Sequence, residues 1–150
     1  MDAALADQLR RIENQANTAA RSGRMVVPIG PFTALIDPSS AMIWLNYAVP
    51  TASLVPSETA EVVGRLRRVF EENGRTLRFE FIEEIWPDLG SALGAAGLEM
   101  QARQPLMLCM PDDFRPLRAP GVIVQSLAAT DRDATLAQFL AVRDAGFESH

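Results

Sequence analysis

The chain has no lysine, one cysteine and one histidine, and each scarcity removes a class of function. All 14 basic residues are arginine, against 19 acidic residues, and the formal net charge is -5. Nucleic-acid binding needs an excess of basic charge, so we expect no nucleic-acid partner. Cys109 cannot form an internal disulfide, and His150 is the last residue. We therefore predict no cysteine–histidine catalytic pair and no metal site.

Long apolar runs are also missing. No run approaches the roughly 20 residues that a membrane-spanning helix needs, so no membrane partner is expected. Residues 1–7 are acidic where a secretory signal would be basic. We expect a reducing, cytoplasmic setting. Cys109 lies in the apolar run 106–110, and we predict that it is a buried structural thiol on a strand.

The remaining pattern predicts one main unit over residues 1–110, a linker over 111–121 and the incomplete start of a second unit over 122–150. The second unit should hold a strand over 122–127 and a helix over 131–145. Helices should alternate with short strands in the first unit, in the order helix 2–21, strands about 25–36 and 42–49, helix 57–73, strand 76–82, helix 87–96 and strand 98–110.

Two helices have clear apolar faces, and one strand is apolar throughout. Strand 42–49 is predicted to be the buried centre of the sheet, and helix 57–73 the parallel crossover to strand 76–82. Ser57 is expected to cap that helix. Spacings of three or four give the apolar faces of helices 2–21 and 57–73, namely Leu5, Leu9, Ile12 and Ala16 in the first, and Val62, Val63, Leu66, Val69 and Phe70 in the second.

This order of elements is similar to that of the GNAT acetyltransferase fold. The amino-acid sequence also resembles the N-terminal half of tandem GNAT proteins. The resemblance rests on three sequence segments: RFEFIEEIWPDL at 78–89, LGAAGLE at 93–99 and PLM at 105–107. The resemblance covers roughly residues 25–145. It implies an α/β (α+β) fold whose mixed, mostly antiparallel sheet has a central parallel strand pair and helices on both faces.

The resemblance directs attention to the loop 49–57. A working GNAT site grips the acetyl-CoA pyrophosphate with a turn of the form Arg/Gln-x-x-Gly-x-Gly/Ala, because backbone N–H groups and a helix N-terminus together bind anions. This loop has no glycine, arginine or glutamine, and Pro50 and Pro56 remove two N–H donors. The positions that would match the cofactor-binding turn are Val49, Thr51, Ala52, Ser53 and Ser57.

Four other residues are candidates for chemistry. Glu80 stands on strand 76–82 beside the expected splay of the parallel pair, where a carboxylate could bind an amine or act as a general base. A solvated strand face is the competing interpretation. Trp44, Asn46 and Tyr47, on strand 42–49, could contact substrate. Core packing is the expected role of the two aromatic residues, and a structural hydrogen bond that of Asn46.

Three hypotheses for function follow. The first is the N-terminal, non-catalytic half of a GNAT-type N-acetyltransferase, which shapes the substrate site or mediates dimerisation. This chain would then require no cofactor, and the complete protein would transfer an acetyl group from acetyl-CoA to an amine. The second is a stand-alone module that binds a small molecule or peptide at the strand splay. The third is a complete acetyltransferase with an unusual cofactor loop.

The expected partners follow from the same resemblance. They are a second copy of the chain, paired through the strand at 122–127, or a C-terminal GNAT half, with a small-molecule amine as ligand.

Overall fold

The computed structural model describes residues 2–116, 120–121 and 133–147, and the chain divides into two compact units, Met1–Gln104 and Pro105–His150. The second unit contains a short 3₁₀ turn, η3 (Pro111–Asp113), and helix α4 (Asp133–Phe147). Helices and strands alternate in the first unit, in the order α1 (Ala3–Ala20), β1 (Met25–Ile29), β2 (Phe32–Ile36), β3 (Tyr47–Pro50), α2 (Thr59–Glu72) and α3 (Leu89–Ala95).

The sheet of the first unit is antiparallel, in the order β1–β2–β3. Gly30, at the tight β1–β2 turn, has a φ of +57°, a conformation that glycine adopts at little cost. The predicted parallel pair is present as a single bridge between Ala48 and Phe79. In that bridge the Ala48 N–H donates to the Arg78 carbonyl at 2.7 Å, and the Glu80 N–H donates to the Ala48 carbonyl at 3.1 Å. The predicted α/β fold with a mainly antiparallel sheet is confirmed.

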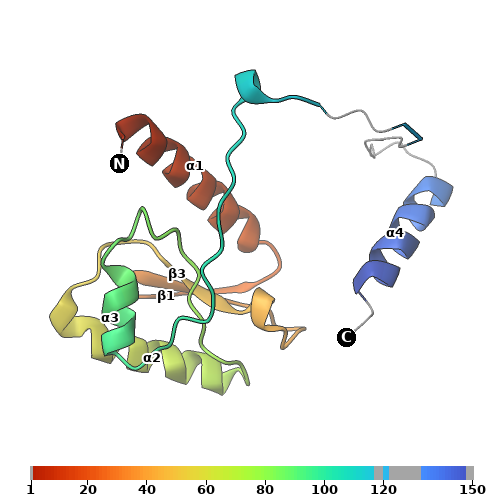
Figure 1. The fold of residues 1–150 in the computed structure, drawn as a ribbon. Helices are drawn as coiled ribbons and strands as arrows, with labels where there is room; N and C mark the ends of the chain where they lie inside the picture. The colour runs from red at the N-terminus through yellow and green to blue at the C-terminus, as the bar shows by residue number, and fades with distance from the viewer. Residues whose placement is uncertain (1, 117–119, 122–132, 148–150) are drawn as a thin grey trace. The chain divides into compact units, whose positions relative to one another are not determined.

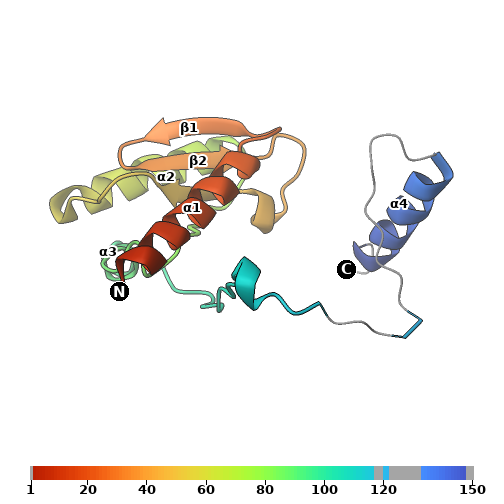
Figure 2. The same ribbon diagram turned by 90° about the horizontal axis from the view of Figure 1, so that it is seen from above.

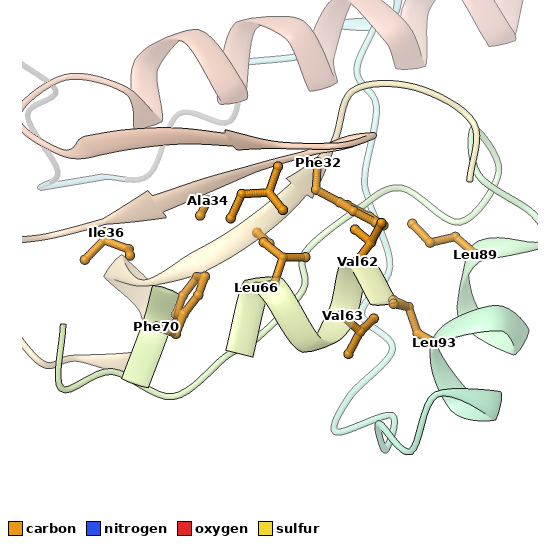
Figure 3. Close-up of a cluster of buried hydrophobic side chains, with 11 residues drawn as sticks. Phe32, Ala34, Ile36, Val62, Val63, Leu66, Phe70, Leu89 and Leu93 are labelled. Atoms are coloured by element: carbon orange, nitrogen blue, oxygen red, sulfur yellow. The ribbon is translucent and has the colours of Figure 1, made fainter. Parts of the chain in front are cut away.

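Helix α2 supplies the core on one face of the sheet (Figure 3). The predicted stripe of helix 57–73 is confirmed, because four of its five residues are buried and Val69 packs against their edge. Helix α3 closes the end of this core with two leucines. The side chains of this core that Figure 3 labels are Phe32, Ala34, Ile36, Val62, Val63, Leu66, Phe70, Leu89 and Leu93.

Helix α1 lies across the other face of the sheet (Figures 1 and 2). Its bounds confirm the predicted helix, and the Asp2 side chain caps its first turn by accepting from the Ala4 N–H at 3.4 Å. Of the predicted apolar face only Leu9 is buried. Leu5 and Ala16 are exposed, whereas Glu13 and Asn17 are half-buried. The side of α1 that lies nearest the sheet is therefore partly polar.

The predicted strand 42–49 is wrong in its first half. The strand begins only at Tyr47, and Ile43–Leu45 form the 3₁₀ turn η1. The reason is Asn46, whose side chain bonds to backbone groups of Asp37, Ser40 and Met42 and so fixes a turn before the strand. Trp44 is 61% exposed, which contradicts its expected place in the core.

The predicted strands after α2 also differ. Strand 76–82 is reduced to the bridge at Phe79, and residues 98–110 form no strand. Pro105 has no N–H to donate, and no described strand pairs with this segment. Cys109 is exposed, so the prediction of a buried thiol is wrong, and Met107 beside it is 90% exposed.

The helix boundaries shift by one or two residues. A 3₁₀ turn, η2 (Pro56–Glu58), precedes α2, and Glu58 rather than Ser57 is its N-cap, with no side-chain cap bond. Helix α3 begins at Leu89 instead of residue 87. The predicted strand 122–127, with the dimer interface placed on it, lies outside the described residues. Helix α4 corresponds to the predicted helix 131–145, and the proposed division at residues 110 and 121 stays a prediction.

Candidate functional site

The loop after β3 uses its backbone donors within the protein. The N–H groups of Thr51 and Ala52 both point to the Pro31 carbonyl, at 2.8 and 3.3 Å. Pro50 and Pro56 have no N–H, and the Glu58 N–H donates to the Val55 carbonyl at 3.0 Å. A phosphate cradle needs successive N–H groups that point outward. This loop turns two of them back onto the β1–β2 turn instead.

The N-terminus of α2 carries carboxylates where an anion would bind. Glu58 is the N-cap residue and Glu61 lies in the first turn. Both complement the positive end of the helix, and both repel a phosphate at the same place. Thr59 is buried, and its hydroxyl donates to the Val55 carbonyl at 3.4 Å, so it is not presented to a ligand.

A cleft of about 270 Å³ lies at the end of β3, between α1 and Trp86. Its apolar wall is Pro50 and Trp86. The indole N–H of Trp86 donates to Glu13 Oε1 at 2.9 Å, which ties α1 to the segment before α3. Such a concave site of mixed polarity is a common place for a ligand. The cleft is lined by Arg10, Glu13, Asn14, Asn17, Thr18, Arg21, Pro50, Thr51 and Trp86.

The polar lining of the cleft consists mainly of hydrogen-bond donors. The Thr18 hydroxyl is engaged, because it donates to the Asn14 carbonyl at 2.7 Å. The amides of Asn14 and Asn17 and the guanidiniums of Arg10 and Arg21 offer hydrogen-bond donors. Glu13 supplies the carboxylate of the lining, and it already accepts from the Trp86 indole N–H. The lining suits a ligand with carboxylate, carbonyl or amide groups.

Sequence reasoning missed this cleft. Five of its polar residues (10, 13, 14, 17 and 21) recur at spacings of three or four on α1, so the signal was a polar stripe beside the apolar one. The residues chosen from sequence lie elsewhere, apart from Thr51, which the loop prediction and the cleft share.

Glu80 does not line the cleft. Its side chain is 57% exposed, and its Oε2 lies 3.6 Å from Arg78 Nη1, a contact that is electrostatic because it is too long for a hydrogen bond. Glu83, another acidic residue of this region, pairs with Arg103 at 2.7 Å. The solvated interpretation of Glu80 fits this exposed geometry.

Asn46 has the structural role expected of it. It is 1% exposed, its Oδ1 accepts from the Asp37 N–H at 2.9 Å, and its Nδ2 donates to the Ser40 and Met42 carbonyls at 2.9 and 2.7 Å. Both of its amide N–H bonds are used by backbone carbonyls, and burial keeps the side chain away from a substrate.

The two aromatic candidates each stack with an arginine. Arg78 lies over the Trp44 ring at 4.8 Å, and Arg24 over the Tyr47 ring at 5.1 Å. Nearby, the pKa of the Asp37 carboxyl lies below its usual range, chiefly because the Ser39 hydroxyl donates to it. Arg78 thus contacts both Trp44 and Glu80.

The described residues form neither a metal-binding cluster nor a membrane-spanning helix. Among the residues that the structure describes, no cluster of acidic, histidine or cysteine side chains could hold a metal ion. None of the described helices combines the length and apolarity needed to cross a bilayer.

Comparison with known proteins identifies the class of fold. No protein-family model matches the chain, and no curated protein matches it either. Among solved structures, a GCN5-related N-acetyltransferase from Kribbella flavida aligns with a TM-score of 0.77 and 24% sequence identity. The alignment covers 91% of this chain and 52% of that protein, so the chain spans about half its length. The chain therefore has the GNAT fold that its sequence resembles.

Proposed function

We propose that this chain is the N-terminal, non-catalytic half of a GNAT-type acyltransferase, which shapes the substrate site or docks the catalytic half. One observation carries the proposal: at the position of the pyrophosphate loop, the chain presents prolines, inward-turned N–H groups and carboxylates. The alignment with half of a longer acetyltransferase supports the same interpretation. In the complete protein, acetyl-CoA would donate the acetyl group to an amine.

The physical argument concerns where binding energy for acetyl-CoA would come from. The pyrophosphate is its most strongly recognised group, and it needs several aligned donors in a positive field. Here Glu58 and Glu61 make the field at the helix end negative, and Thr51 and Ala52 have already given their N–H groups to Pro31. For acetyl-CoA to bind at this loop, the negative charge at the helix end would have to be neutralised and the two N–H groups released from the Pro31 carbonyl.

The cleft beside Trp86 supports a second function, that of a module that binds a small molecule or peptide without catalysis. Its amide and guanidinium donors stand around a concave surface of about 270 Å³. That volume is close to the lower limit for ligand pockets, so the ligand would be small or would insert only one group.

A thermal-shift comparison separates these functions. The purified chain is heated with acetyl-CoA, with small amines and with short dicarboxylic acids, each at about 1 mM, and its melting temperature is recorded. We expect no shift with acetyl-CoA. A shift with a dicarboxylic acid that disappears in Arg10→Gln but persists in Arg68→Gln, which changes an exposed arginine of α2, would support the binding module.

The opposite result identifies a working cofactor site. A rise in melting temperature with acetyl-CoA, together with acetylation of an amine, would show that the loop binds the cofactor despite its prolines. The chain would then be an acetyltransferase as it stands, and the non-catalytic proposal would be wrong.

A further inference from the structure

The connection between β2 and β3 presents three consecutive large apolar side chains to solvent. Met42 is 59% exposed, Ile43 45% and Trp44 61%. Single exposed apolar residues are ordinary on protein surfaces, but a contiguous group that includes tryptophan is typical of a recognition surface. These three residues lie at η1. The apolar run at 42–49 predicted a buried strand, so their exposure was not expected from the sequence.

This connection is held in one conformation by hydrogen bonds. Asn46 makes its three bonds to backbone groups that precede the turn η1. The Asp37 carboxylate accepts from the Ser39 N–H at 2.8 Å, from the Ser39 hydroxyl at 2.7 Å and from the Ser40 N–H at 3.0 Å. Arg75 Nη2 donates to the Asp37 carbonyl at 3.0 Å. A fixed turn loses little conformational entropy when a partner binds, which favours recognition.

Two guanidinium groups border the apolar residues with unused hydrogen-bonding capacity. Arg78 lies over Trp44 and Arg24 over Tyr47, yet within the described residues neither side chain donates a hydrogen bond. Nη1 of each is buried without a partner, and Glu80 stands 3.6 Å from Arg78 Nη1, too far to satisfy it. A ligand carboxylate would reach the guanidiniums through their exposed atoms, because the Arg78 side chain is 23% exposed and Arg24 is half-buried.

We propose that Met42, Ile43, Trp44, Arg24 and Arg78, here called the Trp44 surface, dock a peptide segment in which a carboxylate stands next to a large apolar side chain. The apolar side chain packs on Trp44 and Met42, and the carboxylate accepts from the guanidiniums. Charge complementarity selects this partner, because two arginines flank the apolar patch and neither side chain donates a hydrogen bond within the described residues. Tryptophan and arginine are also the residues that most often dominate binding energy at interfaces.

The test uses the full chain and a displayed library of random 12-residue peptides. We expect the selected peptides to be enriched in aspartate or glutamate beside leucine, phenylalanine or tryptophan. The strongest is then synthesised with a fluorescent label, and its Kd is measured by polarisation. Trp44→Ala and Arg78→Gln should each raise the Kd at least tenfold, whereas Arg68→Gln on α2 should change it less than twofold. Replacing the peptide carboxylate by its amide should also weaken binding about tenfold.

Folding and oligomeric state are measured in parallel. Trp44→Ala changes an exposed side chain, so its melting temperature should match that of the parent chain, and Arg78→Lys provides a second variant that keeps the charge but loses the planar fork. The proposal is overturned if selected peptides lack acidic enrichment, if they bind all variants equally, or if none is selected. A dimer in light scattering that Trp44→Ala dissociates would assign the surface to a second copy and would also overturn it.

Discussion

The two faces of the sheet differ in the side chains that pack on them. Strand residues that alternate toward α2, such as Phe32 and Ile36, are buried with the apolar stripe of that helix. Residues that alternate the other way include Tyr47 and Arg78, which form stacked pairs with arginine and tryptophan. Helix α1, on that second face, buries only Leu9. The comparison indicates that the α2 face carries the main apolar core, while the α1 face combines buried strand residues with polar and stacked side chains.

The largest expected effect tests the α2 face. Phe70 is 0% exposed within the core, so Phe70→Ala should lower the free energy of unfolding by about 3–5 kcal/mol, through lost burial and the cavity left behind. Leu5→Ala, on the exposed side of α1, should cost less than about 1 kcal/mol. Urea denaturation of both variants measures the difference. Equal losses would contradict the division between the two faces.

The next effect concerns Asn46, which is buried between the faces. Asn46→Ala leaves the Asp37 N–H and two carbonyls without their partner and should cost about 1–3 kcal/mol. The exposed Asn14 is a matched control, because Asn14→Ala removes the same amide at a site where it bonds to nothing buried. Asn46→Ala should also shift the fluorescence of Trp44, since the turn that presents it loosens. If Asn46→Ala leaves the free energy of unfolding unchanged, Asn46 does not anchor the turn.

A smaller effect is expected at the cleft. Trp86→Phe keeps the aromatic wall but loses the 2.9 Å bond from the indole N–H to Glu13. We expect a loss of about 0.5–1.5 kcal/mol in the free energy of unfolding, because a solvated carboxylate recovers part of its bonding from water. Glu13→Gln, which retains an acceptor oxygen, should lose less. If Glu13→Gln is the more damaging change, α1 is not held through this bond.

The smallest expected effect is the pH dependence of the stability that the Asp37 carboxylate contributes. Its pKa is lowered in the folded chain, mainly by the Ser39 hydroxyl, so the ionised carboxylate stabilises the fold above its unfolded pKa. That contribution is complete at neutral pH and is lost as the pH falls below about 3.8 and through the folded pKa. Asp37→Asn should therefore lower the melting temperature at pH 7, by a difference that shrinks toward pH 3. A difference that grows in acid would have the wrong sign.

The elements of the α2 face could be predicted from the sequence because periodicity reports burial directly. The stripe Val62–Phe70 and the clean alternation at Leu77, Phe79 and Phe81 both appear in the core or at its edge. The strand 42–49 failed for an equally physical reason. The polar side chain of Asn46 makes three hydrogen bonds to the backbone, which the run of apolar residues does not reveal. The turn that these bonds fix exposes Trp44.

The candidate site was predicted less well than the fold. The missing glycines and the two prolines of the loop were visible in the sequence, but the use of Thr51 and Ala52 by the Pro31 carbonyl depends on the strand register. The cleft combines a stripe of α1 with Trp86, some 70 residues away, and only the folded chain shows which stripe meets which residue.

A calorimetric titration of acetyl-CoA into the chain tests the central claim most directly. The account predicts no binding heat up to about 1 mM ligand, both in the parent chain and after Glu58→Gln with Glu61→Gln, because relieving the negative charge restores no N–H donor at Pro50 or Pro56. Saturable one-to-one binding by the parent chain, weakened by a change at Thr51 or Ser57, would contradict the proposal that this half leaves the cofactor to another.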